Sequence, residues 1–113
     1  MIQQQRTDNY IKICMKAWLI CESCVHAENN SPLPRFELLN ACSDCAKACF
    51  AVVSRLVSNA DDMGDLPFNC LLHCRECSEE CDKFPDEQEV RACAEICYVC
   101  ADVVKELAVF SLN

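Results

Sequence analysis

The stretch Cys70-Leu-Leu-His-Cys74-Arg-Glu-Cys77-Ser-Glu-Glu-Cys81 carries four cysteines at spacings of four, three and four residues. At about 100° per residue, these four positions fall within one narrow stripe on the face of a helix. Leucines at this spacing would form an ordinary bundle seam, whereas cysteines place a row of thiols there. Thiolates are soft ligands that select Cu(I), Zn(II) and iron–sulfur clusters. The stretch therefore indicates a helix face that binds metal.

The other cysteines repeat this rhythm in three further stretches that are expected to be helical. They are Cys14, Cys21 and Cys24, then Cys42, Cys45 and Cys49, and finally Cys93, Cys97 and Cys100. Ala17 occupies a place on the first stripe where another cysteine would fit, and Cys24 lies about 80° away from Cys14 around the helix axis. Beyond their cysteines, the second and fourth stripes continue as aliphatic residues.

The sequence predicts four helices, over Thr7–Glu28, Arg35–Asn59, the stretch from Pro67 to Cys81, and a stretch that ends near Phe110. Pro34 is expected as an early residue of the second helix, where its missing N–H needs no partner. Gly64, the chain's one glycine, marks the turn after that helix. Asp86, followed three residues later by Glu89, is expected to cap the fourth helix.

Short connections between long amphipathic helices favour an all-α, antiparallel up-down four-helix bundle, and one domain is expected over residues 1–113. Antiparallel packing predicts layers of side chains along a cysteine-lined core. The first layer holds Cys24, Cys42, Cys81 and Cys93; the second holds Cys21, Cys45, Cys77 and Cys97. The third holds Ala17, Cys49, Cys74 and Cys100; the fourth holds Cys14, Cys70, Val104 and Val52 or Val53. Leu56 and Leu107 close the far end, so ions are expected to enter at the first layer.

The formal net charge of −8 argues against nucleic acid and anionic membrane surfaces as partners. Thirteen cysteines, an odd number, cannot all pair within one chain. No apolar signal region follows Met1 and no apolar run is long enough to span a bilayer, so a cytoplasmic location is expected. The cytosol keeps thiols reduced, and cysteine-rich proteins there more often bind metal than form disulfides.

Two cysteines three or four residues apart on a helix can share one ion of low coordination number, which favours multiple Cu(I) ions. The main alternative is a zinc-binding structural or regulatory module with about three tetrahedral sites. A thiol oxidoreductase is a third reading, although no strands accompany the Cys-x-x-Cys pairs. No catalytic motif indicates another enzyme class, so the protein is expected not to be an enzyme.

The run Cys74-Arg-Glu-Cys77-Ser-Glu-Glu-Cys81-Asp-Lys-Phe-Pro, followed by Cys93-Ala-Glu-Ile-Cys97-Tyr-Val-Cys100, resembles the bacterial copper storage proteins. These are four-helix bundles that hold many Cu(I) ions on core cysteines. The resemblance is sharpest from Cys70 to Cys100 and extends over the chain. It implies that all thirteen cysteines are ligands, with about one Cu(I) per cysteine.

The resemblance also implies a homotetramer of the cytosolic type. Copper ions and copper donor or acceptor proteins are the expected partners. Apolar residues away from the cysteine face, such as Leu19 and Phe50, likewise favour a homo-oligomer. Exported members have a methionine-rich opening with a nearby histidine, whereas the loop 26–34 has no methionine. His26 is expected at the surface, His73 lies beside the stripe as a candidate extra ligand, and Met63 falls in the far-end turn.

Overall fold

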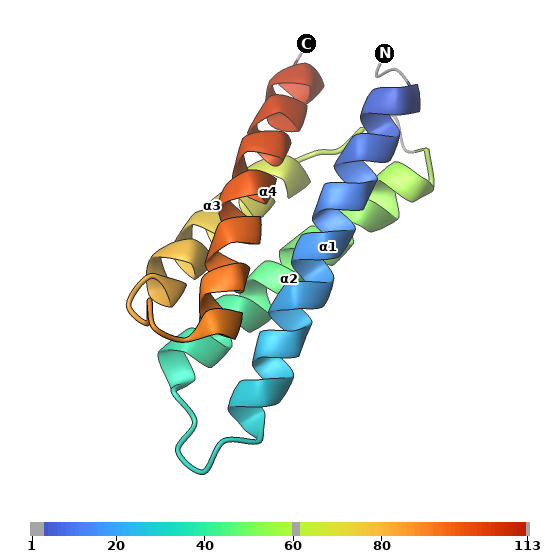
Figure 1. The fold of residues 1–113 in the computed structure, drawn as a ribbon. Coiled ribbons are helices and arrows are strands. Elements are labelled where there is room, and N and C mark those ends of the chain that lie inside the picture. Colours follow the sequence, from blue (N-terminus) through green and yellow to red (C-terminus); the bar gives the residue numbers. More distant parts are fainter. Residues whose placement is uncertain (1–3, 60–61, 113) are drawn as a thin grey trace.

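The computed structural model describes residues 4–59 and 62–112 and contains four helices. They are α1 (Gln4–Asn29), α2 (Phe36–Val57), α3 (Leu66–Cys81) and α4 (Gln88–Leu112), and no strand occurs in these two ranges. The helices lie side by side in an elongated bundle of 47 × 21 × 21 Å, with both chain ends at the same end of it (Figure 1). The predicted all-α, four-helix fold is confirmed.

Each helix packs against two neighbours. The backbones of α1 and α3 both approach those of α2 and α4. In the described residues, the backbones of the diagonal pairs, α1 with α3 and α2 with α4, stay apart, although cysteine side chains of α2 and α4 meet across the core. Cysteine order runs in opposite directions on neighbouring helices, because Cys14 lies beside Cys100 and Cys21 beside Cys93. This reversal fits the antiparallel, up-down arrangement.

The helix boundaries depart from the predicted ones at several termini. α2 begins at Phe36, so Pro34 precedes the helix and Arg35 is its N-cap residue. α2 ends at Val57, because Asn59 adopts a left-handed conformation with φ 55° that asparagine tolerates better than most residues. The helix therefore ends before Gly64, which itself has φ 56° in the following turn.

The fourth helix also starts later than its sequence indicates. α4 begins at Gln88, and the Glu87 carbonyl accepts the first helical hydrogen bond, from the Arg91 N–H at 2.9 Å. Glu87 therefore occupies the N-cap position that was predicted for Asp86. α1 in turn starts at Gln4, three residues before the predicted Thr7.

The core changes character along the bundle. At the end that contains the chain termini, called here the far end, Val52, Leu56, Val104 and Leu107 are buried. Tyr10 is buried with them, and its hydroxyl donates to Glu106 Oε1 at 3.0 Å. Burial and this carboxylate raise the pKa of Tyr10 to about 12. The far end is therefore closed by aliphatic residues, as predicted, with a tyrosine that the sequence pattern did not reveal.

Apolar side chains also occur on the outside of the bundle. Trp18 and Phe50 pack against each other across α1 and α2, with ring centroids 5.0 Å apart. Leu19, Leu72 and Val99 are exposed on three different helices. None of the described helices combines the length and the apolar character needed to cross a membrane.

Candidate metal centre

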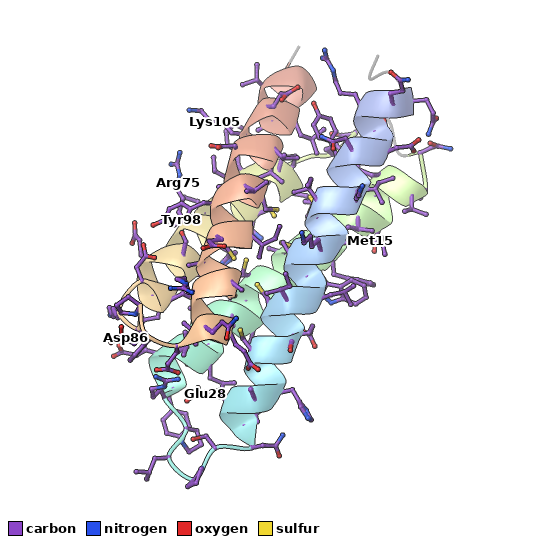
Figure 2. The ribbon with its side chains drawn as sticks, viewed as in Figure 1. Met15, Glu28, Arg75, Asp86, Tyr98 and Lys105 are labelled. Atoms are coloured by element: carbon purple, nitrogen blue, oxygen red, sulfur yellow. The ribbon has the colours of Figure 1, made fainter. Side chains whose placement is uncertain are left out.

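All thirteen cysteines are free thiols and all are buried. Their spacings of three, four or seven residues along each helix turn the thiols toward the bundle interior, with Cys24 the furthest from its stripe. Twelve are at most 1% exposed, and Cys24 is the exception at 8%. In Figure 2 the sulfur atoms lie between the helix ribbons rather than on the outer surface. The fold thus converts four sequence stripes into one internal row of sulfur.

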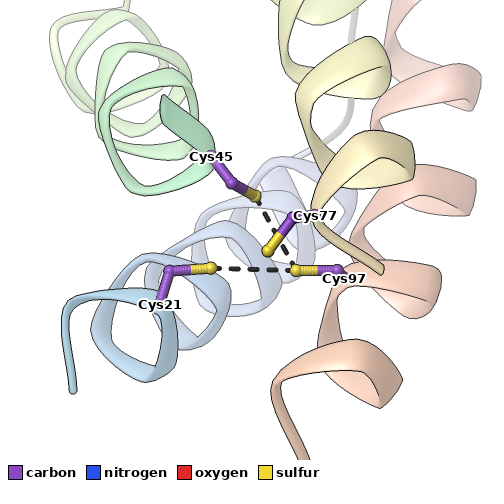
Figure 3. Close-up of side chains that lie close together, drawn as sticks. All are labelled: Cys21, Cys45, Cys77 and Cys97. Atoms are coloured by element: carbon purple, nitrogen blue, oxygen red, sulfur yellow. Dashed lines mark hydrogen bonds between the residues drawn. The ribbon is translucent and has the colours of Figure 1, made fainter. Parts of the chain in front are cut away.

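One layer of four cysteines lies as the sequence predicts. Cys21, Cys45, Cys77 and Cys97 come from α1, α2, α3 and α4, and their sulfur atoms all lie within 4.8 Å of one another. Figure 3 shows the four side chains pointing toward a common centre. Cys97 Sγ lies 3.7 Å from both Cys21 Sγ and Cys45 Sγ. A zinc–thiolate bond is about 2.3 Å long. Two sulfur atoms at these separations can therefore both bond to one ion that lies between them.

Two further groups of four differ from the predicted layers by one member each. The first of these groups lies toward the α1–α2 and α3–α4 connections. There Cys42, Cys81 and Cys93 are joined by Cys77 rather than by Cys24. Cys24 does not join this group because its position around the α1 axis lies well off the cysteine stripe. Its Sγ instead donates to the main-chain oxygen of Glu89 at 3.7 Å.

In the third group, Cys49, Cys74 and Cys100 are joined by Cys70. The predicted α1 member, Ala17, is fully buried but has no ligand atom. Cys70 lies one turn from Cys74 on α3, with the two sulfur atoms 3.9 Å apart, and it completes the group.

The sulfur atoms also form one continuous path. Ten Sγ–Sγ separations of 3.7–3.9 Å join eleven cysteines in a single order, called here the thiol path. The order is Cys42, Cys77, Cys93, Cys21, Cys97, Cys45, Cys74, Cys70, Cys49, Cys100 and Cys14. Nine of these ten steps cross from one helix to another. Neighbouring sulfur atoms along this path are close enough to contact the same ion.

Burial and mutual hydrogen bonds control the charge of the thiols. The hydrogen bond with Cys100 and burial raise the pKa of Cys14. The pKa of Cys74 is raised by the same two causes, together with its other thiol neighbours. Hydrogen bonds donated by Cys21 and further neighbours lower the pKa of Cys93. The pKa values of Cys45, Cys49, Cys77 and Cys100 are lowered as well, so a thiolate at one position depends on the neutral thiols that donate to it.

Cys24 lies at the end of the core that contains two connections, residues 30–35 between α1 and α2 and residues 82–87 between α3 and α4. We call this the thiol end. The thiol of Cys24 borders a pocket of about 460 Å³ that also includes Glu28, Arg35, Glu87 and Glu89. Hydrogen bonding with Cys42 lowers the pKa of Cys24, but contact with Cys93 and burial outweigh it and raise the value to about 12.

Three charged residues at the thiol end, Glu28, Arg35 and Glu87, are paired with one another. Glu28 is buried and forms an ion pair with Arg35 at 2.9 Å, and Arg35 also pairs with Glu87 at 2.6 Å. In Figure 2, Glu28 and Asp86 mark this end of the bundle. The helical pattern of the sequence does not indicate Arg35 as part of a site. Its only signal was a cation placed directly after a proline-rich loop.

The other candidate ligands lie outside the three sulfur groups. His26 is exposed, as predicted, and its ring lies 3.3 Å from the Asn30 side-chain nitrogen. His73 Nδ1 lies 3.8 Å from Glu76 Oε2, and His73 belongs to none of the three groups. Met63 is buried in the far-end turn. The sites that the structure assembles are therefore made of cysteine.

A sequence model of the family described as "Copper storage protein" matches residues 3–109. The chain belongs to the copper storage protein family. Comparison with curated proteins and with solved structures found no match. The match covers α1, α2 and α3 completely and all but the last three residues of α4, so it includes every cysteine of the core. The buried sulfur groups are the places in this chain where a metal ion could be held.

Proposed function

We propose that this protein stores Cu(I) at high capacity on its core thiolates. Membership of the copper storage family supports this function, and the buried cysteine groups supply soft ligands for it. We propose all thirteen cysteines as ligands, with about one Cu(I) per cysteine. Storage requires no chemical turnover, and we propose that the protein is not an enzyme.

The observation that carries this proposal is the continuity of the thiol path. Isolated structural zinc sites use four ligands around one ion. Here Cys77 belongs to two of the three sulfur groups, so those two groups cannot both act as separate four-ligand sites. A thiolate that is shared between neighbouring ions fits a soft, low-coordinate ion such as Cu(I) better. The path therefore favours a chain of bridged ions over a few separate ones.

Zinc remains the second candidate because four buried sulfur atoms within 4.8 Å also suit a tetrahedral ion. Without a shared cysteine, the three groups provide two complete zinc sites. The two candidates therefore differ in capacity by several-fold. A zinc module is also expected to unfold when the metal is removed by a chelator.

We propose that copper reaches the core at the thiol end. Cys24 is the most exposed thiol and borders the pocket there, whereas the far end is filled by Tyr10 and aliphatic side chains. From Cys24 an ion would pass to neighbouring cysteines and then along the thiol path. Each step would exchange one sulfur ligand for another, so no bare ion would form.

We propose further that residues 1–113 form one bundle domain that assembles as a homo-oligomer, a tetramer by family resemblance. Exposed apolar residues on the outer helix faces, such as Leu19 and Leu72, support association. We place the protein in the cytoplasm, where reducing conditions keep free thiols available for metal. Copper donor or acceptor proteins would be its partners. Light scattering of the purified protein measures the oligomeric state.

The decisive test is an anaerobic Cu(I) titration of fully reduced protein against a competing chromogenic Cu(I) chelator, with a parallel thiol count. The storage proposal expects about one ion withheld per cysteine, or 13 in total. Saturation at a few ions would refute storage and favour a zinc or regulatory site. A parallel zinc titration should saturate far below the copper capacity.

A further inference from the structure

At the thiol end, one arginine joins the two connections that close the bundle. The Arg35 guanidinium donates from Nε and Nη2 to the two oxygens of Glu28, at 3.1 and 2.9 Å. It also donates from Nη1 and Nη2 to the two oxygens of Glu87, at 2.6 and 2.8 Å. The Arg35 main-chain N–H adds a bond of 2.6 Å to Glu28 Oε2. We call these three residues the Arg35 bridge.

The bridge ties together parts of the chain that are distant in sequence. Glu28 lies in the last turn of α1, Arg35 precedes α2, and Glu87 precedes α4. The guanidinium carbon also lies 4.2 Å from the centre of the Phe84 ring, in the α3–α4 connection. A planar guanidinium suits two paired carboxylates and an aromatic face, and the point charge of a lysine does not.

The bridge borders the pocket where copper would first meet a thiol. Its three residues line that pocket together with Cys24. Cys24 is 8% exposed, and every other cysteine is at most 1% exposed. With the bridge closed, Cys24 Sγ stays hydrogen-bonded to the Glu89 main-chain oxygen at the start of α4. Wider access to this thiol requires the start of α4 to separate from the end of α1.

The bridge is placed so that it can open without unfolding a helix. The Arg35 and Glu87 side chains are 34% and 46% exposed, and neither residue lies inside a helix. Water can therefore replace their mutual hydrogen bonds. Glu28 is the buried member, with its side chain 8% exposed, and it anchors the bridge to α1.

We propose that the Arg35 bridge limits the rate at which Cu(I) reaches and leaves Cys24, without setting how many ions the core holds. This inference rests on the proposed storage function. In the transfer step, a bond forms between Cu(I) and the Cys24 thiolate while a bond between Cu(I) and its carrier ligand breaks. The Cys24 proton passes to solvent, and copper remains Cu(I). Arg35 acts as a positioning residue because it does not touch the ion.

The test uses two variants of the bridge and one matched control. Glu87→Gln removes one exposed carboxylate of the bridge, and Arg35→Lys keeps the charge but cannot hold both carboxylates. Glu89→Gln is the control, because it makes the same charge change in the same pocket outside the bridge. Uptake is followed by stopped flow from a Cu(I)–bicinchoninate complex. The alkylation rate of Cys24 by iodoacetamide is measured in the reduced, copper-free protein by peptide mass spectrometry.

We expect both bridge variants to take up copper and to alkylate Cys24 about three to ten times faster than the Glu89→Gln control. Final copper content should match the wild type. Rates equal to those of the wild type and the control in both assays would overturn the proposal. If Arg35→Lys fails to fold, as judged by circular dichroism, Glu87→Gln decides alone. Low copper capacity of the wild type would refute storage instead, and the alkylation assay would still test the bridge.

Discussion

A buried thiol must lose its proton before its sulfur can act as a thiolate ligand. Cys14 and Cys74 have pKa values raised by the hydrogen bond with Cys100 and by burial, so at neutral pH they carry protons in the metal-free state. We therefore predict that Cu(I) uptake at pH 7 releases up to about one proton per ion. Titration in weakly buffered solution with a pH-sensitive dye measures this release.

The same linkage sets the direction of the pH effect on affinity. Because binding releases protons, raising the pH strengthens binding and acidification weakens it. A competition titration at pH 6 and at pH 8 should show tighter binding at pH 8. Uptake without proton release would mean that the metal-free core already holds thiolates, contrary to the effect expected from burial.

Ala17 provides a test of the cysteine stripe at a single position. It is fully buried on the α1 stripe between Cys14 and Cys21, yet it offers no ligand. We predict that Ala17→Cys raises the copper capacity by one ion beyond the value of the wild type. The added sulfur atom fills a tight site, so a stability cost of about 1–3 kcal/mol is expected in the metal-free protein. Copper content after desalting measures the capacity.

Ala46→Cys is the matched control for this experiment. Ala46 is equally buried on α2 but follows Cys45 directly, about 100° around the helix from it. The copper capacity of the Ala46→Cys variant should equal that of the wild type. Equal gains from both variants would show that any buried thiol binds copper, and would argue against a defined stripe.

At the scale of the helices, the far end stabilises the bundle independently of the thiols. Leu107 on α4 is fully buried, whereas Val109, two residues further on, is 54% exposed. We predict that Leu107→Ala lowers the free energy of unfolding of the metal-free protein by about 2–5 kcal/mol, because it leaves a cavity. Val109→Ala should change it by less than about 0.5 kcal/mol. Urea unfolding measured by circular dichroism gives both values.

Measuring the copper capacity of Leu107→Ala and Val109→Ala distinguishes an effect on packing at the far end from an effect on metal binding. Both variants should hold as many ions as the wild type, because neither position contributes a sulfur ligand. A loss of capacity in Leu107→Ala, under conditions where it remains folded, would mean that the aliphatic layer also positions the thiols.

The ion pair of Glu28 and Arg35 at the thiol end makes the folding stability, rather than the copper affinity, depend on pH. The hydrogen bonds from Arg35 lower the pKa of Glu28 below its ordinary value of 4.5. The stabilisation is therefore fully present above that ordinary value and is lost as the pH falls through the lower folded-state pKa. Arg35 faces Glu28, and Glu87 lies on the opposite edge of the guanidinium.

We predict that Glu28→Gln lowers the stability of the metal-free protein at pH 7 by about 1–3 kcal/mol, because a charged hydrogen-bond network is lost. Acidification below about pH 4 should shrink the difference between variant and wild type, as Glu28 itself becomes neutral. Urea unfolding at pH 7 and pH 3.5 provides the comparison. A difference that persists unchanged at low pH would show that the effect arises from packing and not from charge.

For the whole molecule, the helical periodicity of the cysteines predicted the features that depend only on helix geometry. Four stripes of cysteine at a period of 3.6 residues fix four helices with their thiols inward, and helix lengths fix the approximate register. The layer of Cys21, Cys45, Cys77 and Cys97 follows from these two facts and is confirmed. The choice of ion drew on ligand softness and on family resemblance, and so it required more than the pattern itself.

Periodicity could not predict what depends on single side-chain directions. The helical wheel places Cys24 off its stripe, but it does not reveal that Cys24 contacts the main chain of Glu89 instead of completing the first layer. Glu28, which the sequence indicates only as the end of the first helix, is buried against Arg35. That contact depends on how the loop 30–35 returns to α1, and a helical pattern carries no information about a loop path.

The proposed single opening makes a prediction that concerns the bundle from end to end. One double variant replaces Cys24 and Cys81, at the thiol end, with alanine. The other replaces Cys14 and Cys70, near the far end, in the same way. Each removes two of the thirteen cysteines, so both should lose the same capacity, about two ions. Any difference in uptake rate therefore reports position and not ligand number.

We predict that the Cys24/Cys81 variant takes up its first ions about three to ten times more slowly than the Cys14/Cys70 variant, equivalent to a barrier higher by about 0.7–1.4 kcal/mol. The reason is that ions arriving at the thiol end would lack the first thiolate to which they transfer. Stopped-flow uptake from a Cu(I)–chelator complex measures both rates. Equal slowing in the two variants would mean that copper enters at both ends, and then the packed layer of Tyr10, Val104 and Leu107 must open as readily as the pocket beside Cys24.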